Sequence, residues 1–116
     1  MTGDNRSSME YLSERFPEVA DAYRDQFRRT VELDGPLSPR IRELVLLGAY
    51  AATRQPRAFA LHCERALRSG CDVDEVRQAV LLTLGASATL EWVVDALRSV
   101  DEIHQRVTDG EAVVPE

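Results

Sequence analysis

The stretch LVLLGAYAA (residues 44–52) decides the fold class of this chain, because as a helix it would be apolar on every side. A surface helix has an apolar stripe and a polar face, whereas a helix that is apolar all round is buried. Ser38 and Pro39 stand ahead of this stretch as an N-cap and a proline at the first helical position. The sequence therefore predicts a buried central helix that begins at Pro39.

Helical periodicity continues on the N-terminal side of this central helix. Apolar residues recur every three or four positions from about Met9 to Glu32, and Pro17 divides this region into a short helix and a longer one. The residues LDGP (33–36) have the composition of a turn. Two helices are therefore expected before the central one.

Three helices are expected after the central one. Gly70 stands where glycine commonly follows the end of a helix. Asp72 and Glu75 have the spacing of a capping box, which predicts the start of the next helix. The three expected helices cover residues 56–69, about 73–84 and about 89–107, with breaks at 53–56 and 85–89.

No stretch alternates between apolar and polar residues as a strand does. The sequence therefore predicts an all-α fold, with a single helical domain of about five to six helices over residues 9–107. The polar residues 1–8 and 108–116 are expected to be flexible ends.

The last expected helix carries a broad apolar stripe, which has two interpretations. It can pack inside the same chain, or it can form an interface with a second subunit, and it is too short to indicate a coiled coil. The stripe recurs at steps of three and four: Leu90, Val93, Leu97, Val100, His104 and Val107.

Composition excludes several classes of function. The 116 residues make one domain, and a net charge of −6 disfavours binding to a nucleic-acid backbone. All 14 cationic residues are arginine, so no lysine amine is present for covalent catalysis. No apolar run is long enough to span a bilayer, and no basic-then-apolar leader is visible. We therefore expect a cytoplasmic protein that binds neither nucleic acid nor membrane.

Histidine and cysteine are too sparse to predict a metal centre. The chain has two of each, at His62, His104, Cys63 and Cys71. A zinc site takes about four nitrogen or sulfur ligands at tight spacing, and these four residues do not have that spacing. The sequence also has no glycine-rich loop of the kind that binds phosphate. We therefore expect no metal and no cofactor, and we interpret both cysteines as small buried hydrophobic residues.

His62 is the residue best suited to acid–base chemistry. It shares a helix face with apolar residues, and such surroundings disfavour the charged imidazolium and leave a neutral base. Glu43 would orient the imidazole across the helix pair and share a proton with it. The alternatives are a core histidine with one hydrogen-bond partner, and a glutamate that interacts with the dipole at the start of its own helix.

Four arginines lie at the two ends of the central helix and in the loop that follows, at Arg40, Arg42, Arg54 and Arg57. A small carboxylate substrate would need an arginine that binds both of its oxygens, and Arg42 and Arg57 are the candidates. The alternative is that these arginines pair with some of the 20 acidic residues.

Residues 33–102 resemble the carboxymuconolactone decarboxylase-like family, which also contains the alkylhydroperoxidase-D-like thiol peroxidases. The family pattern is matched in chain order by Ser38-Pro39, Arg42-Glu43-Leu44, His62, Ala66-Leu67, Gly70 and Asp74-Glu75-Val76. The resemblance implies an all-α, alkylhydroperoxidase-D-like fold whose paired helices assemble into homotrimers or homohexamers.

The resemblance also bears on the chemistry. In the peroxidase branch a C-x-x-C-x-x-x-H motif does the redox work, with an upstream glutamate in the proton relay, and the Glu and His fall on Glu43 and His62. The two cysteine positions fall on Gln55 and Ala58, and Cys63 is out of register. Peroxiredoxin-type antioxidant activity is therefore disfavoured. The cysteine-less segment is similar to the decarboxylase branch, which acts without a cofactor on a small carboxylated lactone.

The leading hypothesis is a cofactor-independent decarboxylase or isomerase of a small carboxylate. His62 would transfer the proton, Glu43 would orient it, and Arg42 and Arg57 would bind the substrate carboxylate. The alternative is a catalytically inactive helical module that binds its partners as an oligomer.

Overall fold

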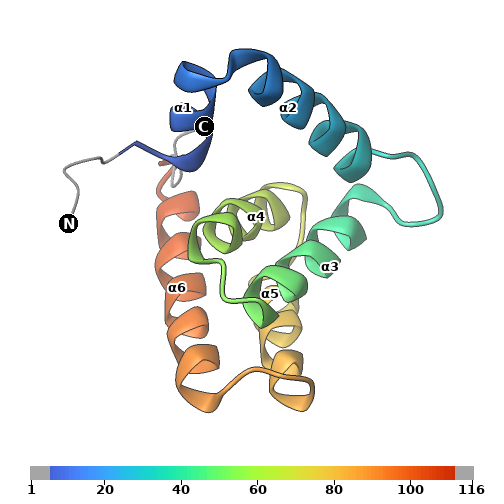
Figure 1. Ribbon diagram of the computed structural model, residues 1–116. Helices are drawn as coiled ribbons and strands as arrows, with labels where there is room; N and C mark the ends of the chain where they lie inside the picture. Colours follow the sequence, from blue (N-terminus) through green and yellow to red (C-terminus); the bar gives the residue numbers. More distant parts are fainter. Residues whose placement is uncertain (1–5, 112–116) are drawn as a thin grey trace. The chain divides into compact units, whose positions relative to one another are not determined.

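The computed structural model describes residues 6–111, and every regular element in that range is helical (Figure 1). The predicted all-α fold is confirmed. None of these helices combines the length and the apolarity that crossing a bilayer requires, and the cytoplasmic location stays a prediction. The elements are α1 (Ser8–Arg15), α2 (Pro17–Val31), α3 (Pro39–Ala52), α4 (Pro56–Arg68), α5 (Val73–Leu81), the 3-10 helix η1 (Leu82–Gly85) and α6 (Leu90–Thr108).

The chain divides into two compact units within the turn predicted for residues 33–36. The first unit comprises residues 1–35, with α1 and α2, and the second comprises residues 36–116, with α3 to α6. The expected flexibility of the two ends stays a prediction, because residues 1–5 and 112–116 lie outside the described range.

The first unit is a pair of helices with the break predicted at Pro17. α1 begins where Ser7 Oγ accepts a hydrogen bond from the backbone N–H of Glu10 at 3.1 Å. Pro17 is the first residue of α2, a position where its missing N–H costs no helical hydrogen bond. Arg24 of α2 donates to Ser13 Oγ of α1 at 2.9 Å, which links the two helices.

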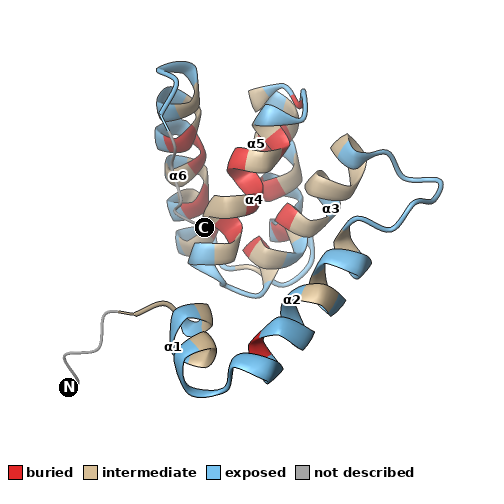
Figure 2. Cartoon of the chain, turned by 90° about the horizontal axis from the view of Figure 1, so that it is seen from above, coloured by how far each residue is buried: buried red, intermediate tan, exposed pale blue. Residues whose placement is uncertain are grey.

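The second unit holds the main hydrophobic core. α3 packs against α4 and α5, and α6 packs against the same two helices. Figure 2 shows the buried residues on the sides by which these helices face one another. The core comprises Leu47, Ala51, Phe59, Cys63, Ala66, Cys71, Val76, Val80, Val93, Ala96, Val100 and Ile103.

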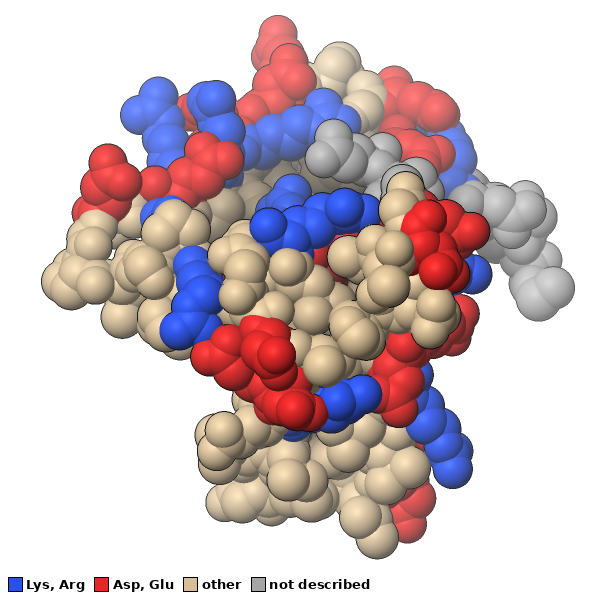
Figure 3. Space-filling model, turned by 180° about the vertical axis from the view of Figure 1, so that it is seen from behind, with Lys and Arg blue, Asp and Glu red and all other residues tan. Residues whose placement is uncertain are grey.

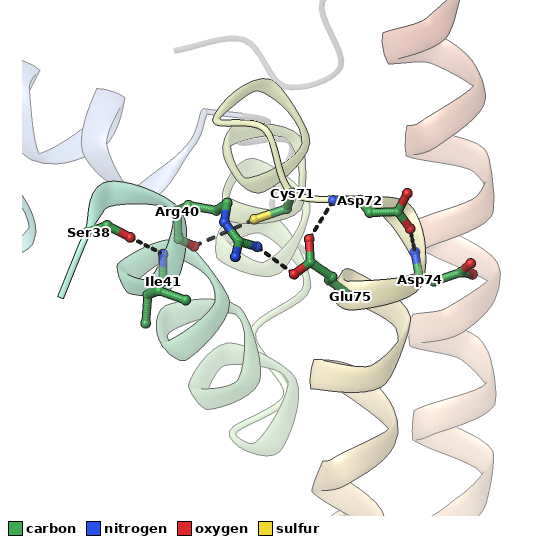
Figure 4. Close-up of polar contacts among 7 residues, drawn as sticks. All are labelled: Ser38, Arg40, Ile41, Cys71, Asp72, Asp74 and Glu75. Carbon is green, nitrogen blue, oxygen red and sulfur yellow. Dashed lines mark hydrogen bonds and ion pairs between the residues drawn. The ribbon is translucent and has the colours of Figure 1, made fainter.

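Two helices of the second unit begin with the predicted caps. At the start of α3, Ser38 Oγ accepts a hydrogen bond from the N–H of Ile41 at 3.3 Å. At the start of α5, the Asp72 carboxylate accepts from the N–H of Asp74 at 2.7 Å, and Glu75 Oε1 accepts from the N–H of Asp72 at 2.9 Å (Figure 4). The predicted capping box is therefore confirmed.

The prediction that the central helix is buried on every side is wrong for a single chain. Leu47 and Ala51 of α3 are fully buried, but Val45 is 57% exposed and Ala49 is exposed as well. The main neighbours of α3 within its unit are α4, α5 and η1, and they cover one side of it. A helix that is apolar all round needs neighbours on all sides, and this unit supplies them on one.

The stripe of α6 follows the intramolecular interpretation. Val93 is 1% exposed and Val100 is fully buried, and both belong to the core of the second unit, against which Leu97 and Val107 pack. Leu90, at the first position of the stripe, is 62% exposed. The core therefore takes most of the stripe and leaves its N-terminal end at the surface.

Candidate functional site

The two candidate acid–base residues lie on neighbouring helices of the second unit and contact each other. Glu43 lies in the second turn of α3, and His62 lies in the middle of α4. Glu43 Oε2 is 2.7 Å from His62 Nδ1. The side chain of His62 is 1% exposed and that of Glu43 is 16% exposed. The Glu43 carboxylate therefore interacts with the imidazole. It lies beyond the first turn of α3, and the helix dipole acts most strongly within that turn, so the interaction with the dipole is the weaker explanation for this residue.

Tyr50 also contacts the imidazole, and it was not predicted from the sequence. Its ring stacks on the ring of His62, with centroids 5.0 Å apart and an angle of 27° between the planes. Tyr50 follows Glu43 by two helical turns, so both side chains leave α3 on the same face. That spacing was the available signal, because it places the tyrosine opposite whatever Glu43 contacts.

The arrangement fixes the imidazole in one orientation. A carboxylate on Nδ1 favours the tautomer whose Nδ1–H donates to it, and that tautomer has Nε2 as its basic atom. The carboxylate also stabilises the imidazolium that forms when Nε2 takes a proton. The stacked Tyr50 ring restricts rotation of the imidazole about its bond to the chain. Chemically, the pair is suited to moving one proton to and from a fixed atom.

All four arginines predicted as candidates lie in the second unit. Arg40 pairs with Glu75, and Arg54 donates to Thr89 Oγ1 at 2.9 Å, so these two arginines have structural partners in the same unit. Arg42 is partly exposed beside Glu43, and Arg57 is exposed in the first turn of α4. Their role as carboxylate anchors stays a prediction.

The two thiols are buried and protonated, which does not suit the redox chemistry of a dithiol. Cys63 is fully buried, and burial, with the nearby charge of Glu64, raises the pKa of its thiol to about 12. Burial also raises the pKa of Cys71, whose Sγ donates to the carbonyl of Arg40 at 3.6 Å. Both thiols therefore remain protonated at neutral pH. Across residues 6–111, no three His, Cys, Asp or Glu side chains are grouped to hold a metal ion.

A second polar cluster joins the start of α3 to the start of α5 (Figure 4). Arg40 Nη1 lies 2.5 Å from Glu75 Oε2, while Glu75 Oε1 accepts the N–H of Asp72 at 2.9 Å. The Glu75 carboxylate thus caps α5 and, through its ion pair with Arg40, links α5 to α3. Arg40 precedes Glu43 by one helical turn, so this cluster fixes the end of the helix that carries the glutamate of the pair.

Comparison with known proteins gives one family. The model of the carboxymuconolactone decarboxylase family matches residues 17–102. A crystal structure of a proposed carboxymuconolactone decarboxylase from Burkholderia xenovorans LB400 is similar, with a TM-score of 0.72 and 25% sequence identity over 95% of this chain and 87% of that one. No protein of curated function matches this chain. On the match to the family model, which covers most of its length, this chain belongs to the carboxymuconolactone decarboxylase family.

Proposed function

We propose that this protein is a cofactor-independent decarboxylase or isomerase of a small carboxylate, in which His62 and Glu43 form the proton relay. The observation that carries the proposal is the 2.7 Å contact between Glu43 Oε2 and His62 Nδ1 in a nearly solvent-free setting. Membership of the family supports the substrate class. The protonated, displaced thiols favour this chemistry over a dithiol peroxidase cycle.

Decarboxylation needs an electron acceptor in the substrate and a proton donor at the carbon that loses CO₂. The electron pair of the breaking C–C bond passes into a conjugated carbonyl of the substrate, CO₂ departs, and Nε2 of the His62 imidazolium then protonates the carbon. Glu43 stabilises the imidazolium before that transfer and orients the neutral ring after it. In an isomerisation, the same nitrogen removes a proton at one carbon and returns it at another.

The remaining parts of the proposal concern binding. Arg42 and Arg57 lie on the two helices that carry the relay, and each offers a guanidinium for the substrate carboxylate. Because the His62 side chain is 1% exposed, the substrate reaches Nε2 only when the side chains that cover it move apart. Gating of this kind occurs commonly on a microsecond-to-millisecond scale.

The test is turnover of small carboxylated lactones in D₂O. Proton NMR follows the loss of substrate and the entry of deuterium at the reacting carbon, and infrared absorption follows the release of CO₂. His62→Asn retains an N–H donor near the position of Nδ1 but has no second ring nitrogen to accept and donate a proton. We expect it to lower kcat about 10²- to 10⁴-fold, the usual contribution of general acid–base catalysis. Glu43→Gln should lower kcat less, because Nε2 remains.

The chain offers a matched control for the relay. His104, the other histidine, is half-buried on α6, and His104→Asn should leave kcat unchanged. Helix content by circular dichroism should be equal in the wild type and in all three variants. Turnover by His62→Asn at the wild-type rate would refute the relay.

A second function has an observation of its own, namely the burial of His62. A histidine that is 1% exposed, hydrogen-bonded to one carboxylate and stacked on one tyrosine has the surroundings of a structural core residue. In that case the protein is a helical binding module without catalysis. It would show no turnover, and His62→Asn would lower the melting temperature without any other effect.

Assembly into a homotrimer or homohexamer is part of both proposals, and the end of the second unit supports it. The segment LLTLGASATL (81–90) contains no charged residue. Figure 1 places it, in yellow and orange, at the lower end of the view, and the same end is almost entirely tan in Figure 3. Exposed apolar patches of this kind mark association surfaces. The exposed leucines of the segment are Leu81 (50%), Leu82 (68%), Leu84 (40%) and Leu90 (62%).

A further inference from the structure

A cavity of about 240 Å³ lies between α4 and α6 in the second unit, apart from the relay. Neither Glu43 nor His62 lines it. Its wall is formed by the N-terminal half of α4 and by one face of α6, along about three turns. The cavity is therefore a separate feature of the fold, and the proposed reaction makes no use of it.

The wall of this cavity is apolar and aromatic. Phe59, Ala96 and Ile103 line it and are 2%, 3% and 5% exposed, so they form a dry base. Trp92 forms another part of the wall, and its Nε1 donates to the carbonyl of Ala51 at 2.5 Å. This hydrogen bond holds the indole ring in place, so the aromatic part of the wall is preformed.

Both charged residues in the lining are acidic. Asp95 and Glu102 lie two turns apart on the same face of α6, and their side chains are 63% and 70% exposed. Each has an arginine 3.6 Å away, Arg98 for Asp95 and Arg106 for Glu102. These ion pairs join exposed side chains and are weak, so a ligand ammonium group can take the place of either arginine.

We propose that this cavity binds a small organic cation, with an apolar or aromatic body against the base and an ammonium group between Asp95 and Glu102. An aromatic wall and two carboxylates are the combination that attracts such a ligand. The ring of Trp92 already has a cation beside it, since Arg54 Cζ is 5.8 Å from its centroid. The volume is below that of sites for drug-sized ligands, so the ligand has about ten non-hydrogen atoms or fewer.

The opposite charge of the ligand separates this site from the relay. The proposed substrate is a carboxylate, whereas the proposed ligand is a cation and both charged residues that line this cavity are acidic. A failure of either proposal therefore leaves the other intact.

The experiment uses the single tryptophan of the chain, which lines the cavity, as its reporter. Trp92 fluorescence is titrated with benzylammonium, and with benzoate and benzyl alcohol as anionic and neutral ligands of matched shape. We expect a saturable change with benzylammonium at a Kd of about 1 mM, weakened by added salt. Benzoate should give no saturable change, and benzyl alcohol should bind at least about fivefold more weakly.

Two variants locate the charge. Asp95→Asn with Glu102→Gln should weaken benzylammonium about tenfold, because it removes both rim carboxylates. The control, Glu91→Gln with Asp34→Asn, removes the same amount of charge from residues that do not line the cavity, and should leave Kd within about twofold of the wild type. Glu91 is the neighbour of the reporter in the sequence, so it also tests for direct effects on the fluorescence.

Three results would overturn the proposal. The first is the absence of a saturable change with benzylammonium up to about 50 mM. The second is equal binding of benzoate or benzyl alcohol. The third is an unchanged Kd in the rim double variant, when circular dichroism shows that it is folded.

Discussion

Replacing Glu43 by leucine tests the buried pair through stability, independently of any substrate. The substitution keeps the approximate shape of the side chain and removes the carboxylate acceptor. The imidazole of His62, which is 1% exposed, then has neither this hydrogen-bond partner nor water in its place. A hydrogen bond to a charged group contributes about 1.5–3 kcal/mol, and a buried donor left without an acceptor costs about 1–3 kcal/mol. Since Glu43 itself is 16% exposed, we expect a loss of about 2 kcal/mol in the free energy of unfolding. For a domain of this size that corresponds to a melting temperature about 10 °C lower.

The assay is urea unfolding at a fixed protein concentration, followed by the fluorescence of Trp92, which belongs to the same unit as the pair. The control is Asp101→Ala, which removes the carboxylate from an ion pair with Arg77 whose side chains are 61% and 41% exposed. An exposed pair adds little to stability, so the control should lose clearly less than Glu43→Leu.

A double variant separates the pair from simple changes in packing. Glu43→Leu with His62→Phe replaces both polar partners by apolar ones of similar size, which leaves no buried donor without an acceptor. It should recover at least about 1 kcal/mol relative to Glu43→Leu. The reasoning is refuted if Glu43→Leu loses no more than Asp101→Ala, or if the double variant recovers nothing.

Three further predictions follow from the thiols, the α3–α5 cluster and the apolar segment. Burial raises the pKa of Cys63 from 9.0 to about 12, so the contribution of this thiol to stability is complete below pH 9.0 and is lost as the pH rises toward 12. In urea titrations, the free energy of unfolding of Cys63→Ala should therefore fall less than that of the wild type between pH 9.0 and 12. The hydrogen bond from the N–H of Asp72, followed by the one from Arg40, holds the pKa of Glu75 below 4.5, so the contribution of Glu75 to stability is present above pH 4.5 and is lost as the pH falls. The free energy of unfolding of Glu75→Gln should therefore decrease less than that of the wild type as the pH falls below 4.5. Leu82→Glu should reduce the mass measured by light scattering to that of a smaller assembly, whereas Val19→Glu, at an exposed position of α2, should not.

Local signals carried most of the fold. Pro17, the Ser38–Pro39 start and the capping box of Asp72 and Glu75 each depend on a few neighbouring residues, and each appears where the sequence predicted it. Burial is different, because it depends on which elements pack together. The apolar run of α3 was therefore predicted to be buried on every side, although its unit covers only one of them.

The candidate site was predicted in part for the same reason. The sequence named Glu43 and His62 by their chemistry, but their contact depends on the register between α3 and α4, which no short motif encodes. Tyr50 was missed because its only signal, the spacing of two helical turns from Glu43, becomes informative once Glu43 is known to contact His62. The cavity between α4 and α6 was missed because its wall combines residues from two helices far apart in the sequence.

The relay and the thiols together narrow the chemistry that we propose. Cys63 follows His62 directly, but adjacent helical positions point about 100° apart, and the thiol is buried and protonated. The imidazole therefore has no thiolate to activate. Gln55 and Ala58 stand at the positions where the resemblance would place the cysteines of the peroxidase branch. With the carboxylate–imidazole pair present and the thiols displaced, we propose that the proton His62 moves comes from or goes to the substrate itself, as a decarboxylation or an isomerisation requires.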